Sequence, residues 1–409
     1  MFKKNRTILI VAPYGFNDRM ANFVEFIIAR LLAENGWKVI GLVRHEGKAE
    51  KIESICGVKI YRYKNFGQGL NFLFKIFFIE RPSIVHVFQQ RNNRLGILAA
   101  ILAKLAFKPL LFTEYGLLHD HYLVDDRDDP LGKPLKPNGL AFSFWQIIIN
   151  SFIKKTASFK KNFKNYFFHW PLTHADNIVF VSRHNLEIAK NLGLKIYIYL
   201  SYIIDSARWN KMPEDKNKEE YLPELKKITG RPFCLFIGQL KLRKGWDIYL
   251  EAIPMVDESV MPLFALITSS AKEPPAYFTQ KIQELGIEDR VIFFGRVSGE
   301  TLKKIYNLSL IVVVPSRYEG FGLVAIEAFE NKKPLIASMV TALDENVIDG
   351  YNSLTIPPKD PRKLAAAITR LAPDKELQQK LVAGGEETLK KLKSSELKQQ
   401  WLDFYEKLI

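Results

Sequence analysis

Short runs of apolar, β-branched residues alternate along this chain with longer segments whose apolar residues recur at helical spacing. Runs of this kind occupy residues 7–12, 83–88 and 109–113 in the first half and 308–314 in the second. Such runs predict strands that are buried on both faces, as in parallel sheets covered by helices. The alternation therefore predicts an α/β protein built on doubly wound parallel sheets.

The chain is long enough for two domains. Its 409 residues exceed what one hydrophobic core usually organises. The polar stretch 211–227, which contains Pro213 and Pro223, is the best candidate for a linker. We therefore expect Rossmann-like domains at residues 1–207 and 208–395. A last helix is predicted over 396–409, where Trp401, Phe404 and Tyr405 recur at helical spacing.

Composition limits the cellular setting and the partners. The two cysteines, Cys56 and Cys234, lie far apart beside predicted strands, which favours free, buried thiols in a reducing cytosol. The apolar run near the N-terminus is too short for a signal peptide, and no run is long enough to span a bilayer. We expect a cytoplasmic protein, soluble or peripheral at the cytoplasmic membrane face. The net charge of +15 comes without a zinc-finger spacing or a single-strand-binding motif, so nucleic acid is not an expected partner.

An aromatic stripe gives part of this basic charge a second interpretation. Lysines spread around the side of the predicted helix opposite the stripe. Such a helix can pack on a sheet with its lysines in solvent, or it can lie in an anionic membrane interface. The sequence leaves both alternatives open. The stripe consists of Trp145, Ile149, Phe152, Phe159, Phe163 and Phe167.

The most informative motif for function lies at residues 315–327. It follows a predicted strand, turns at Gly320 and Gly322, and continues into a predicted helix. Glycines let a backbone approach a ligand closely, and a helix N-terminus favours an anion such as phosphate. Glu319 and Glu327 are suited to accept hydrogen bonds from sugar hydroxyls. The motif predicts a site for a nucleotide sugar, unless Glu319 only caps a helix and Glu327 only faces solvent.

This segment resembles the E-x7-E signature of the retaining glycosyltransferases of family 4, which have the GT-B fold. The resemblance covers most of the chain. It implies two Rossmann-like domains that face a central cleft, with the donor bound mainly by the C-terminal domain and the acceptor by the N-terminal one. It also implies that the helix over 396–409 packs back on the N-terminal domain.

Other segments extend the resemblance. Residues 235–245 resemble the family's phosphate loop, in which Lys244 matches the usual lysine while Gln239 stands where an arginine is common. Arg243 could supply the missing positive charge. Residues 289–297, which end in Gly295 and Arg296, resemble the strand and loop beside the nucleobase, although an ordinary sheet edge would look the same. The donor-binding residues implied are Gly15, Gly238, Gln239, Arg243, Arg296, Gly320, Phe321, Gly322, Leu323 and Glu327.

The N-terminal half departs further from the family pattern. Only Gly15 is present where paired glycines are common. Tyr115 stands where the family usually has histidine, and His119 follows four residues later. Either side chain could face the transferred sugar, or Tyr115 could be a structural aromatic. The catalytic residues implied are Lys244, Glu319, Tyr115 and His119.

No metal or cofactor is expected. The acidic run at 125–129 lies among prolines and glycines, in a predicted loop rather than at a strand end. His119 and His121 have no third histidine at a ligand spacing. The family's usual account is also metal-independent, because cations of the protein stabilise the leaving diphosphate.

The sequence therefore predicts a retaining glycosyltransferase that moves a hexose-type sugar from a UDP- or GDP-sugar to a hydroxyl of a glycan or lipid-linked acceptor. Peripheral contact with an anionic membrane is part of this hypothesis. A competing interpretation is a catalytically weak or inactive nucleotide-sugar-binding subunit of a glycosylation complex, because Gln239 and Tyr115 replace charged or titratable groups.

Overall fold

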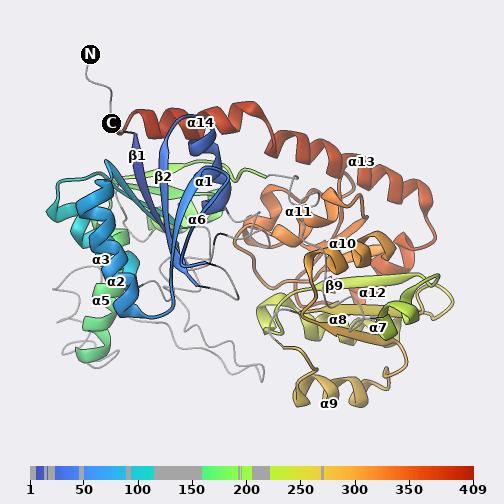
Figure 1. The fold of residues 1–409 in the computed structure, drawn as a ribbon. Helices are drawn as coiled ribbons and strands as arrows, with labels where there is room; N and C mark the ends of the chain where they lie inside the picture. The colour runs from blue at the N-terminus through green and yellow to red at the C-terminus, as the bar shows by residue number, and fades with distance from the viewer. Residues whose placement is uncertain are drawn as a thin grey trace. The chain divides into compact units, whose positions relative to one another are not determined.

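The computed structural model describes residues 6–12, 16, 24–45, 50–88, 94–114, 159–191, 194, 196–204, 222–268 and 271–409 (Figure 1). The chain divides into two compact units. The first takes its described residues from within Met1–Asp126, Leu135–Asp205 and Leu392–Ile409, and the second from within Ser206–Lys391. Each unit is an α/β layer structure with its own sheet, as the alternation of strand and helix segments predicts.

The sheet of the first unit has the strand order β3-β4-β2-β1-β5-β6-β7-β8. Its strands are parallel except β3, which pairs antiparallel with β4 through a turn at Cys56 and Gly57. That hairpin was not predicted, and it leaves Cys56 exposed, so the expectation of two buried thiols is wrong for this residue. The strands are β1 (Thr7–Val11), β2 (Lys38–Arg44), β3 (Ile52–Ile55), β4 (Val58–Tyr63), β5 (Ile84–Phe88), β6 (Leu110–Glu114), β7 (Asn177–Phe180) and β8 (Tyr197–Tyr199).

Helices cover this sheet. One core cluster joins the sheet to α2, the π-helical turn η2, α3, α5 and α6, whose buried members include Leu73, Ile76, Ala99, Leu172 and Ala189. The last helix, α14, packs within the same unit. Helix bounds are α1 (Val24–Glu34), α2 (Phe66–Lys75), η2 (Ile76–Glu80), α3 (Arg94–Leu105), α5 (Phe159–His174), α6 (Arg183–Asn191) and α14 (Ser395–Glu406).

Buried polar contacts hold α14 on the first sheet. The Tyr405 hydroxyl lies 2.6 Å from Nδ1 of His86, and Nε2 of His86 lies 2.7 Å from the Thr113 hydroxyl. Burial lowers the pKa of His86 well below its usual value, so the ring is neutral and can bridge two hydroxyls. The Trp401 ring nitrogen also donates to the carbonyl of Ser201 at 2.9 Å. The contacts of Tyr405 and Trp401 thus join α14 to residues 319 and 200 positions earlier in the chain.

The sheet of the second unit has the order β11-β10-β9-β12-β13-β14, and its strands are all parallel. The predicted linker 211–227 is only partly a connection, since its last residues form helix α7; residues 205–221 lie outside the described residues. The strands are β9 (Phe233–Ile237), β10 (Leu263–Ile267), β11 (Val291–Gly295), β12 (Ile311–Val314), β13 (Leu335–Ser338) and β14 (Leu354–Ile356).

Four helices of this unit, α8 to α11, connect successive strands, while α7 precedes β9, and α12 and α13 follow β14. Their bounds are α7 (Leu222–Ile228), α8 (Trp246–Ala252), α9 (Ala276–Leu285), α10 (Gly299–Leu308), α11 (Leu323–Glu330), α12 (Pro361–Leu371) and α13 (Lys375–Leu392), with short 3₁₀ turns η7 (Leu242–Lys244), η8 (Ile253–Met255) and η9 (Thr341–Glu345).

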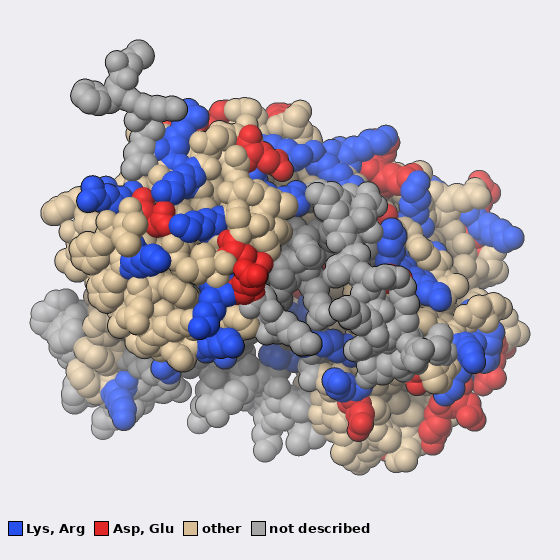
Figure 2. Space-filling model, viewed as in Figure 1, with Lys and Arg blue, Asp and Glu red and all other residues tan. Residues whose placement is uncertain are grey.

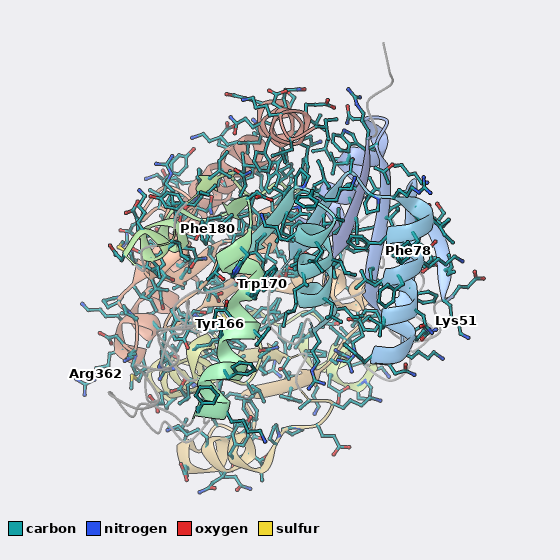
Figure 3. The ribbon with its side chains drawn as sticks, turned by 90° about the vertical axis from the view of Figure 1, so that its left-hand side faces the viewer. Lys51, Phe78, Tyr166, Trp170, Phe180 and Arg362 are labelled. Atoms are coloured by element: carbon teal, nitrogen blue, oxygen red, sulfur yellow. The ribbon has the colours of Figure 1, made fainter. Side chains whose placement is uncertain are left out.

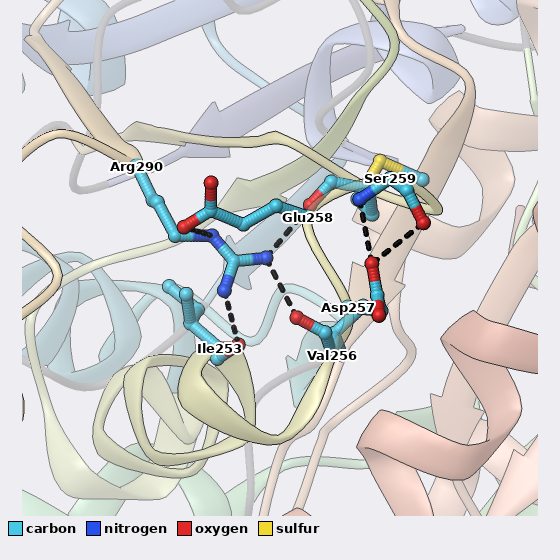
Figure 4. A network of polar contacts seen from close by, with 7 residues as sticks. Ile253, Val256, Asp257, Glu258, Ser259 and Arg290 are labelled. Atoms are coloured by element: carbon cyan, nitrogen blue, oxygen red, sulfur yellow. Dashed lines mark hydrogen bonds and ion pairs between the residues drawn. The ribbon is translucent and has the colours of Figure 1, made fainter.

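Arg290 braces the outer strand β11. Its guanidinium donates to the carbonyl oxygens of Ile253, Val256 and Met261 at 2.8 to 3.0 Å (Figure 4). A buried cation that satisfies three carbonyls fixes the turn after η8 against the start of β11. Arg290, which precedes β11 in the predicted segment 289–297, therefore has a structural role. In this it differs from Arg296, which follows the same strand.

Candidate functional site

Two loops lie side by side at the carboxyl edge of the second sheet. β9 and β12 are adjacent and parallel, with Leu235 opposite Val312. The chain leaves β9 through residues 238–241 and η7, and it leaves β12 through residues 315–322 before α11 begins. Ligands of parallel α/β sheets bind at this edge, where strand ends and helix starts meet. The loops contain most of the residues that the sequence singles out.

A close backbone approach joins the two loops. Gly245 has a φ of 72°, and a Cβ at this position would collide with the carbonyl oxygen of Pro315. Beside it, the backbone N–H of Arg317 donates to the carbonyl of Arg243 at 2.7 Å. Only glycine combines this φ with this approach, so Gly245 lets the loops lie as one surface.

Lys244 and Glu319 form an ion pair at the centre of this surface. The Lys244 ammonium lies 2.6 Å from Oε1 of Glu319, and the Ser316 hydroxyl donates to the same oxygen at 2.8 Å. Their side chains are only 16% and 7% exposed. Burial alone would raise the pKa of Glu319, but the positive charges of Lys244 and Arg243 outweigh it and lower the pKa. The carboxylate is thus ionised, with two cations beside it.

A second ion pair, between Arg317 and Asp247, also joins the two loops. Arg317 makes two hydrogen bonds to the carboxylate of Asp247, at 2.8 and 2.6 Å, and also donates to the carbonyl of Leu242. Asp247 lies in the first turn of α8, and Leu242 opens η7. A forked arginine contact of this kind is rigid. The Arg317 contacts therefore fix the position of η7, and with it the backbone position of Lys244.

The backbone of Glu319 is anchored separately. Its N–H donates to the Thr341 hydroxyl, and that hydroxyl donates to the Glu319 carbonyl, both at 2.8 Å. Thr341 opens η9, which follows β13 at the same edge of the sheet. Glu319 therefore has its main chain held by one neighbouring loop and its side chain by another.

Glu327 lies in the second turn of α11 and has a different partner. The Tyr306 hydroxyl donates to its carboxylate at 2.8 Å, and Tyr306 is itself buried. Gly322 begins this helix with a φ of 85°, where a Cβ would collide with the Leu343 side chain. The glycine turn thus brings the start of α11 close to η9, as the motif predicts for a tight turn.

The remaining predicted residues of this unit surround the pair or lie further along the edge. Gly238 directly follows β9, with Gln239 exposed beside it. Arg296 is exposed at the end of β11, which β10 separates from β9. The loop residues Gly320 and Leu323 are half-buried, while Phe321 is buried.

Three predicted residues cannot be placed. Gly15, Tyr115 and His119 lie outside the described residues, and so does the acidic run 125–129. In the part of the chain that the structure does describe, no group of three or more His, Cys, Asp or Glu side chains is arranged to hold a metal ion.

Several side chains that support the site were not predicted. Ser316 and Arg317 lie inside the recognised motif, but sequence alone gave them no role. Asp247, Tyr306 and Thr341 reach the site from other segments, and none of them has a local signal of its own. One sequence feature could have pointed to Asp247: it is a charged residue in the first helical turn after the predicted phosphate loop, residues 235–245.

Comparison with known proteins identifies the second unit. Residues 217–388 match the family model described as "Glycosyl transferases group 1". This range includes β9, β12 and both site loops. The chain therefore contains a glycosyltransferase group 1 domain, which confirms the coarser part of the family resemblance.

An uncharacterized glycosyltransferase of Methanocaldococcus jannaschii is 34% identical over 140 residues, or 34% of this chain and 35% of that protein. The chain spans 35%, 58% and 44% of the length of the first three curated relatives that it matches.

Solved structures are similar over nearly the whole chain. Sucrose-phosphate synthase from Thermosynechococcus elongatus has a TM-score of 0.69 at 20% identity, covering 98% of this chain and 99% of that one. The Anabaena protein HepE in complex with UDP and glucose has a TM-score of 0.68 at 15% identity, with coverages of 98% and 99%. At such identities the likeness concerns the fold. It confirms the predicted class, two parallel-sheet α/β domains of the GT-B type.

Proposed function

We propose that the protein is a retaining glycosyltransferase that moves a hexose-type sugar from a UDP- or GDP-sugar to an acceptor hydroxyl. The observation that carries this proposal is the Lys244–Glu319 pair, placed where two loops meet at the carboxyl edge of a group 1 domain. A buried cation next to a buried carboxylate suits a ligand that has both a phosphate and hydroxyl groups.

Donor binding would rearrange this ion pair. The diphosphate of the donor takes the Lys244 ammonium as its counter-charge, with further support from the first N–H groups of α11. Glu319, whose carboxylate keeps the hydrogen bond from Ser316, then accepts hydrogen bonds from the donor sugar. Glu327, oriented by Tyr306, accepts from the ribose hydroxyls. Gly238, Gln239, Gly320, Phe321, Gly322 and Leu323 would line the donor from these two loops.

Chemistry at this site needs positive charge where the diphosphate leaves. As the bond from the anomeric carbon to the diphosphate oxygen breaks, Lys244 and Arg243 stabilise the developing negative charge. The acceptor oxygen attacks the same face and forms the new glycosidic bond while its proton passes to the departing diphosphate oxygen, which gives retention. Arg296, at the end of β11, is assigned to the nucleobase side, and no metal or other cofactor is required. The residues proposed to complete the reaction from the first unit are Gly15, Tyr115 and His119.

The acceptor is proposed to be a glycan or a lipid-linked glycan, with the enzyme in the cytoplasm and in peripheral contact with an anionic membrane. Basic side chains are spread over the visible surface of both units (Figure 2), which accords with the net charge of +15. Among the described helices, none is both long and apolar enough to cross a membrane.

A nucleotide-sugar-binding subunit without turnover is the second candidate. It is motivated by Gln239, where an arginine would be expected to contact the diphosphate. Arg243 argues against it, because its charge already acts on the carboxylate of Glu319 and so lies within reach of the same ligand.

A nucleotide screen followed by a turnover assay tests the proposal. UDP, GDP and ADP are added in turn, and a ligand at about 100 times its dissociation constant should add roughly 2.7 kcal/mol to stability. The nucleotide that raises the melting temperature names the donor base. Release of that nucleoside diphosphate from a matching sugar donor then shows turnover. Binding without release for every donor and acceptor would favour the subunit, and no shift with any nucleotide would contradict both candidates.

A further inference from the structure

Large apolar side chains are unusually exposed at one edge of the first sheet. Among the described residues, the five most exposed large hydrophobic side chains all belong to the first unit. They are Phe107 at 95%, Phe78 at 72%, Leu105 at 71%, Ile79 at 66% and Ile196 at 60%. We refer to these five residues as the amino-edge rim. Of these residues, Phe78 is labelled in Figure 3.

The rim residues are neighbours although they are distant in sequence. Each stands in a connection that leads into a strand: Phe78 and Ile79 before β5, Leu105 and Phe107 before β6, and Ile196 before β8. The strands β5, β6, β7 and β8 follow one another in the sheet and are parallel. Their starts therefore share one edge, about 15 Å long for four strands.

Hydrogen bonds between the connections confirm this arrangement. The N–H of Val85 donates to the carbonyl of Pro109 at 3.0 Å, which places the entry to β5 beside the entry to β6. The N–H of Ile178 donates to the carbonyl of Ile196 at 3.0 Å, which does the same for β7 and β8. The N–H of Asp176 likewise donates to the carbonyl of Leu110 at 2.8 Å, which joins the entries to β6 and β7, so the segments that contain the rim residues lie along one sheet edge.

Two rim residues, Phe107 and Ile196, have backbone conformations that cost stability. Phe107 has a φ of 53° and Ile196 a φ of 60°, in the left-handed region that glycine usually occupies after a helix. A bulky or β-branched side chain is strained there and, at these exposures, also leaves its apolar surface in water. No contact of the described fold offsets this cost for Phe107. A surface that meets an apolar phase would offset it.

The charges around the rim are basic. Arg81 is exposed and Lys108 is half-buried in the same two connections, while Lys104 is paired with Asp176 at 2.6 Å. The helices behind the rim, α2, α3 and α5, contain no Asp or Glu. The one acid of η2, Glu80, is buried and bound by Lys38 and Lys59. Any partner of this surface is therefore both apolar and anionic.

We propose that the amino-edge rim inserts into the headgroup region of an anionic lipid bilayer, with Arg81 and Lys108 against lipid phosphates. The exposed side chains are spread along one sheet edge, on η2, at the end of α3 and in two turns. This suits a fluid interface that needs no matching surface shape. The rim lies opposite the carboxyl edge, where parallel sheets bind their ligands, so docking leaves that edge open. The proposed function already includes peripheral contact with an anionic membrane; this inference rests on that part of it and names the surface that makes the contact.

This surface differs from the aromatic stripe predicted from the sequence. Trp145, Ile149 and Phe152 of that stripe lie outside the described residues. Phe159, Phe163 and Phe167 are 39% to 43% exposed on α5, so they are not packed into the core. Because the last turn of α5 leads into β7, Phe159 begins about 22 Å from the rim along the helix. The two features can be tested separately.

Flotation of the full-length protein with lipid vesicles tests the rim. The vesicles are phosphatidylcholine alone or phosphatidylcholine with phosphatidylglycerol. We expect binding to the anionic vesicles that weakens as salt is raised, and little binding to the neutral ones. Phe107→Gly should lower the bound fraction roughly threefold to tenfold, since a fully exposed aromatic is lost.

Phe107→Gly also separates lipid binding from folding. Because glycine suits the left-handed backbone, its melting temperature should stay level or rise while vesicle binding falls. Phe66→Ser is the matched control. This 46% exposed residue begins α2 at the opposite edge of the sheet, and its loss should leave vesicle binding unchanged.

Three outcomes would overturn the proposal. The wild-type protein fails to float with anionic vesicles, or Phe107→Gly and Phe66→Ser reduce binding equally. In the third, Phe107→Gly abolishes a concentration-dependent dimer in gel filtration while no vesicle binding occurs, which makes the rim an interface between two copies. The thermal shift with UDP or GDP is measured on the same samples, so failure of lipid binding is distinguished from failure of the donor site.

Discussion

Among the described residues, Glu80 of the first unit and Glu319 of the second are buried glutamates paired with lysine, and they differ in what surrounds them. Glu80 of the first unit and Glu319 of the second are both only 7% exposed in their side chains. Glu80 receives Lys38, Lys59 and the Tyr61 hydroxyl, at 2.6 to 2.9 Å. Tyr61 is on β4, as is Lys59, and Lys38 is on neighbouring β2, so its partners come from the sheet itself.

Glu319 has its lysine on a different loop, and that loop lies at the ligand-binding edge. The pair therefore joins two segments that a ligand could separate, whereas the partners of Glu80 are part of the sheet. The comparison teaches that a buried ion pair alone does not mark a function. What supports the proposed function of the Lys244–Glu319 pair is its place at the carboxyl edge of a parallel sheet, with helix starts beside it.

Replacing the lysine of each pair should give the largest difference in kcat/KM between the two units. In the proposed mechanism Lys244→Ala removes the charge beside the leaving diphosphate, so it should lower kcat/KM roughly 10²- to 10³-fold. Lys59→Ala removes a partner of Glu80 and should leave kcat/KM unchanged. Both are measured by nucleoside diphosphate release with the donor found in the nucleotide screen. Equal activities of the two variants would remove the catalytic role from Lys244.

Arg243 and Gln239 sharpen the account of charge in the phosphate loop. Arg243→Ala should lower kcat/KM about tenfold to a hundredfold if Arg243 replaces the arginine that Gln239 lacks. Adding Gln239→Arg to this variant should restore much of the lost kcat/KM, because the new guanidinium lies in the same phosphate loop, four residues before position 243. A double variant no better than Arg243→Ala would mean that the two positions face different groups.

Glu80 should matter for stability instead of activity. Burial alone would raise its pKa, but hydrogen bonds from Lys59, Lys38 and Tyr61 outweigh it and lower the pKa from 4.5 to about 2. A lowered pKa stabilises the fold above the unfolded-state value, and this stability is lost as the pH falls from about 5 toward 2. Because both lysines are partly exposed, we expect a contribution of about 1 to 2 kcal/mol at pH 7.

Urea unfolding from pH 7 to pH 3 measures this contribution. Glu80→Gln should lower the unfolding free energy at pH 7 and flatten its decline toward acid, while leaving donor turnover at pH 7 unaltered. A variant whose free energy falls with pH as steeply as that of the wild type would show that other carboxylates cause the acid sensitivity.

The sequence predicted what depends on contiguous residues. The strand at 308–314 and the glycine turn that follows it form a local pattern, and the structure has β12, a tight loop and α11 there. The fold class followed from repeating such patterns. The first residues of that predicted strand are the exception, since α10 runs on to Leu308 before β12 begins at Ile311.

Contacts between distant segments could not be read in the same way. Arg317 meets Asp247 across 70 positions, and Tyr306 meets Glu327 across 21, so neither pair has a spacing that periodicity detects. The antiparallel β3 was missed for a related reason, because the turn at Cys56 and Gly57 interrupts a region that otherwise alternates strand and helix. Such partners are determined by packing rather than by local pattern.

Removal of divalent metal should have the smallest effect of all on turnover. In the proposed mechanism the Lys244 ammonium, Arg243 and the start of α11 supply the positive charge that a metal supplies in other sugar transferases, so activity in excess EDTA should equal the untreated rate. The donor must be saturating in this assay. Free metal binds the released nucleoside diphosphate in solution, and a saturating donor keeps product inhibition small with or without metal. If activity is lost in EDTA and restored by Mg²⁺ or Mn²⁺, then Lys244 is not sufficient, and a metal ion bound elsewhere in the protein contacts the diphosphate.

The same assay on Lys244→Ala shows whether added metal can replace the lost ammonium. We expect that it cannot, because Glu319 alone offers a metal too few oxygen ligands.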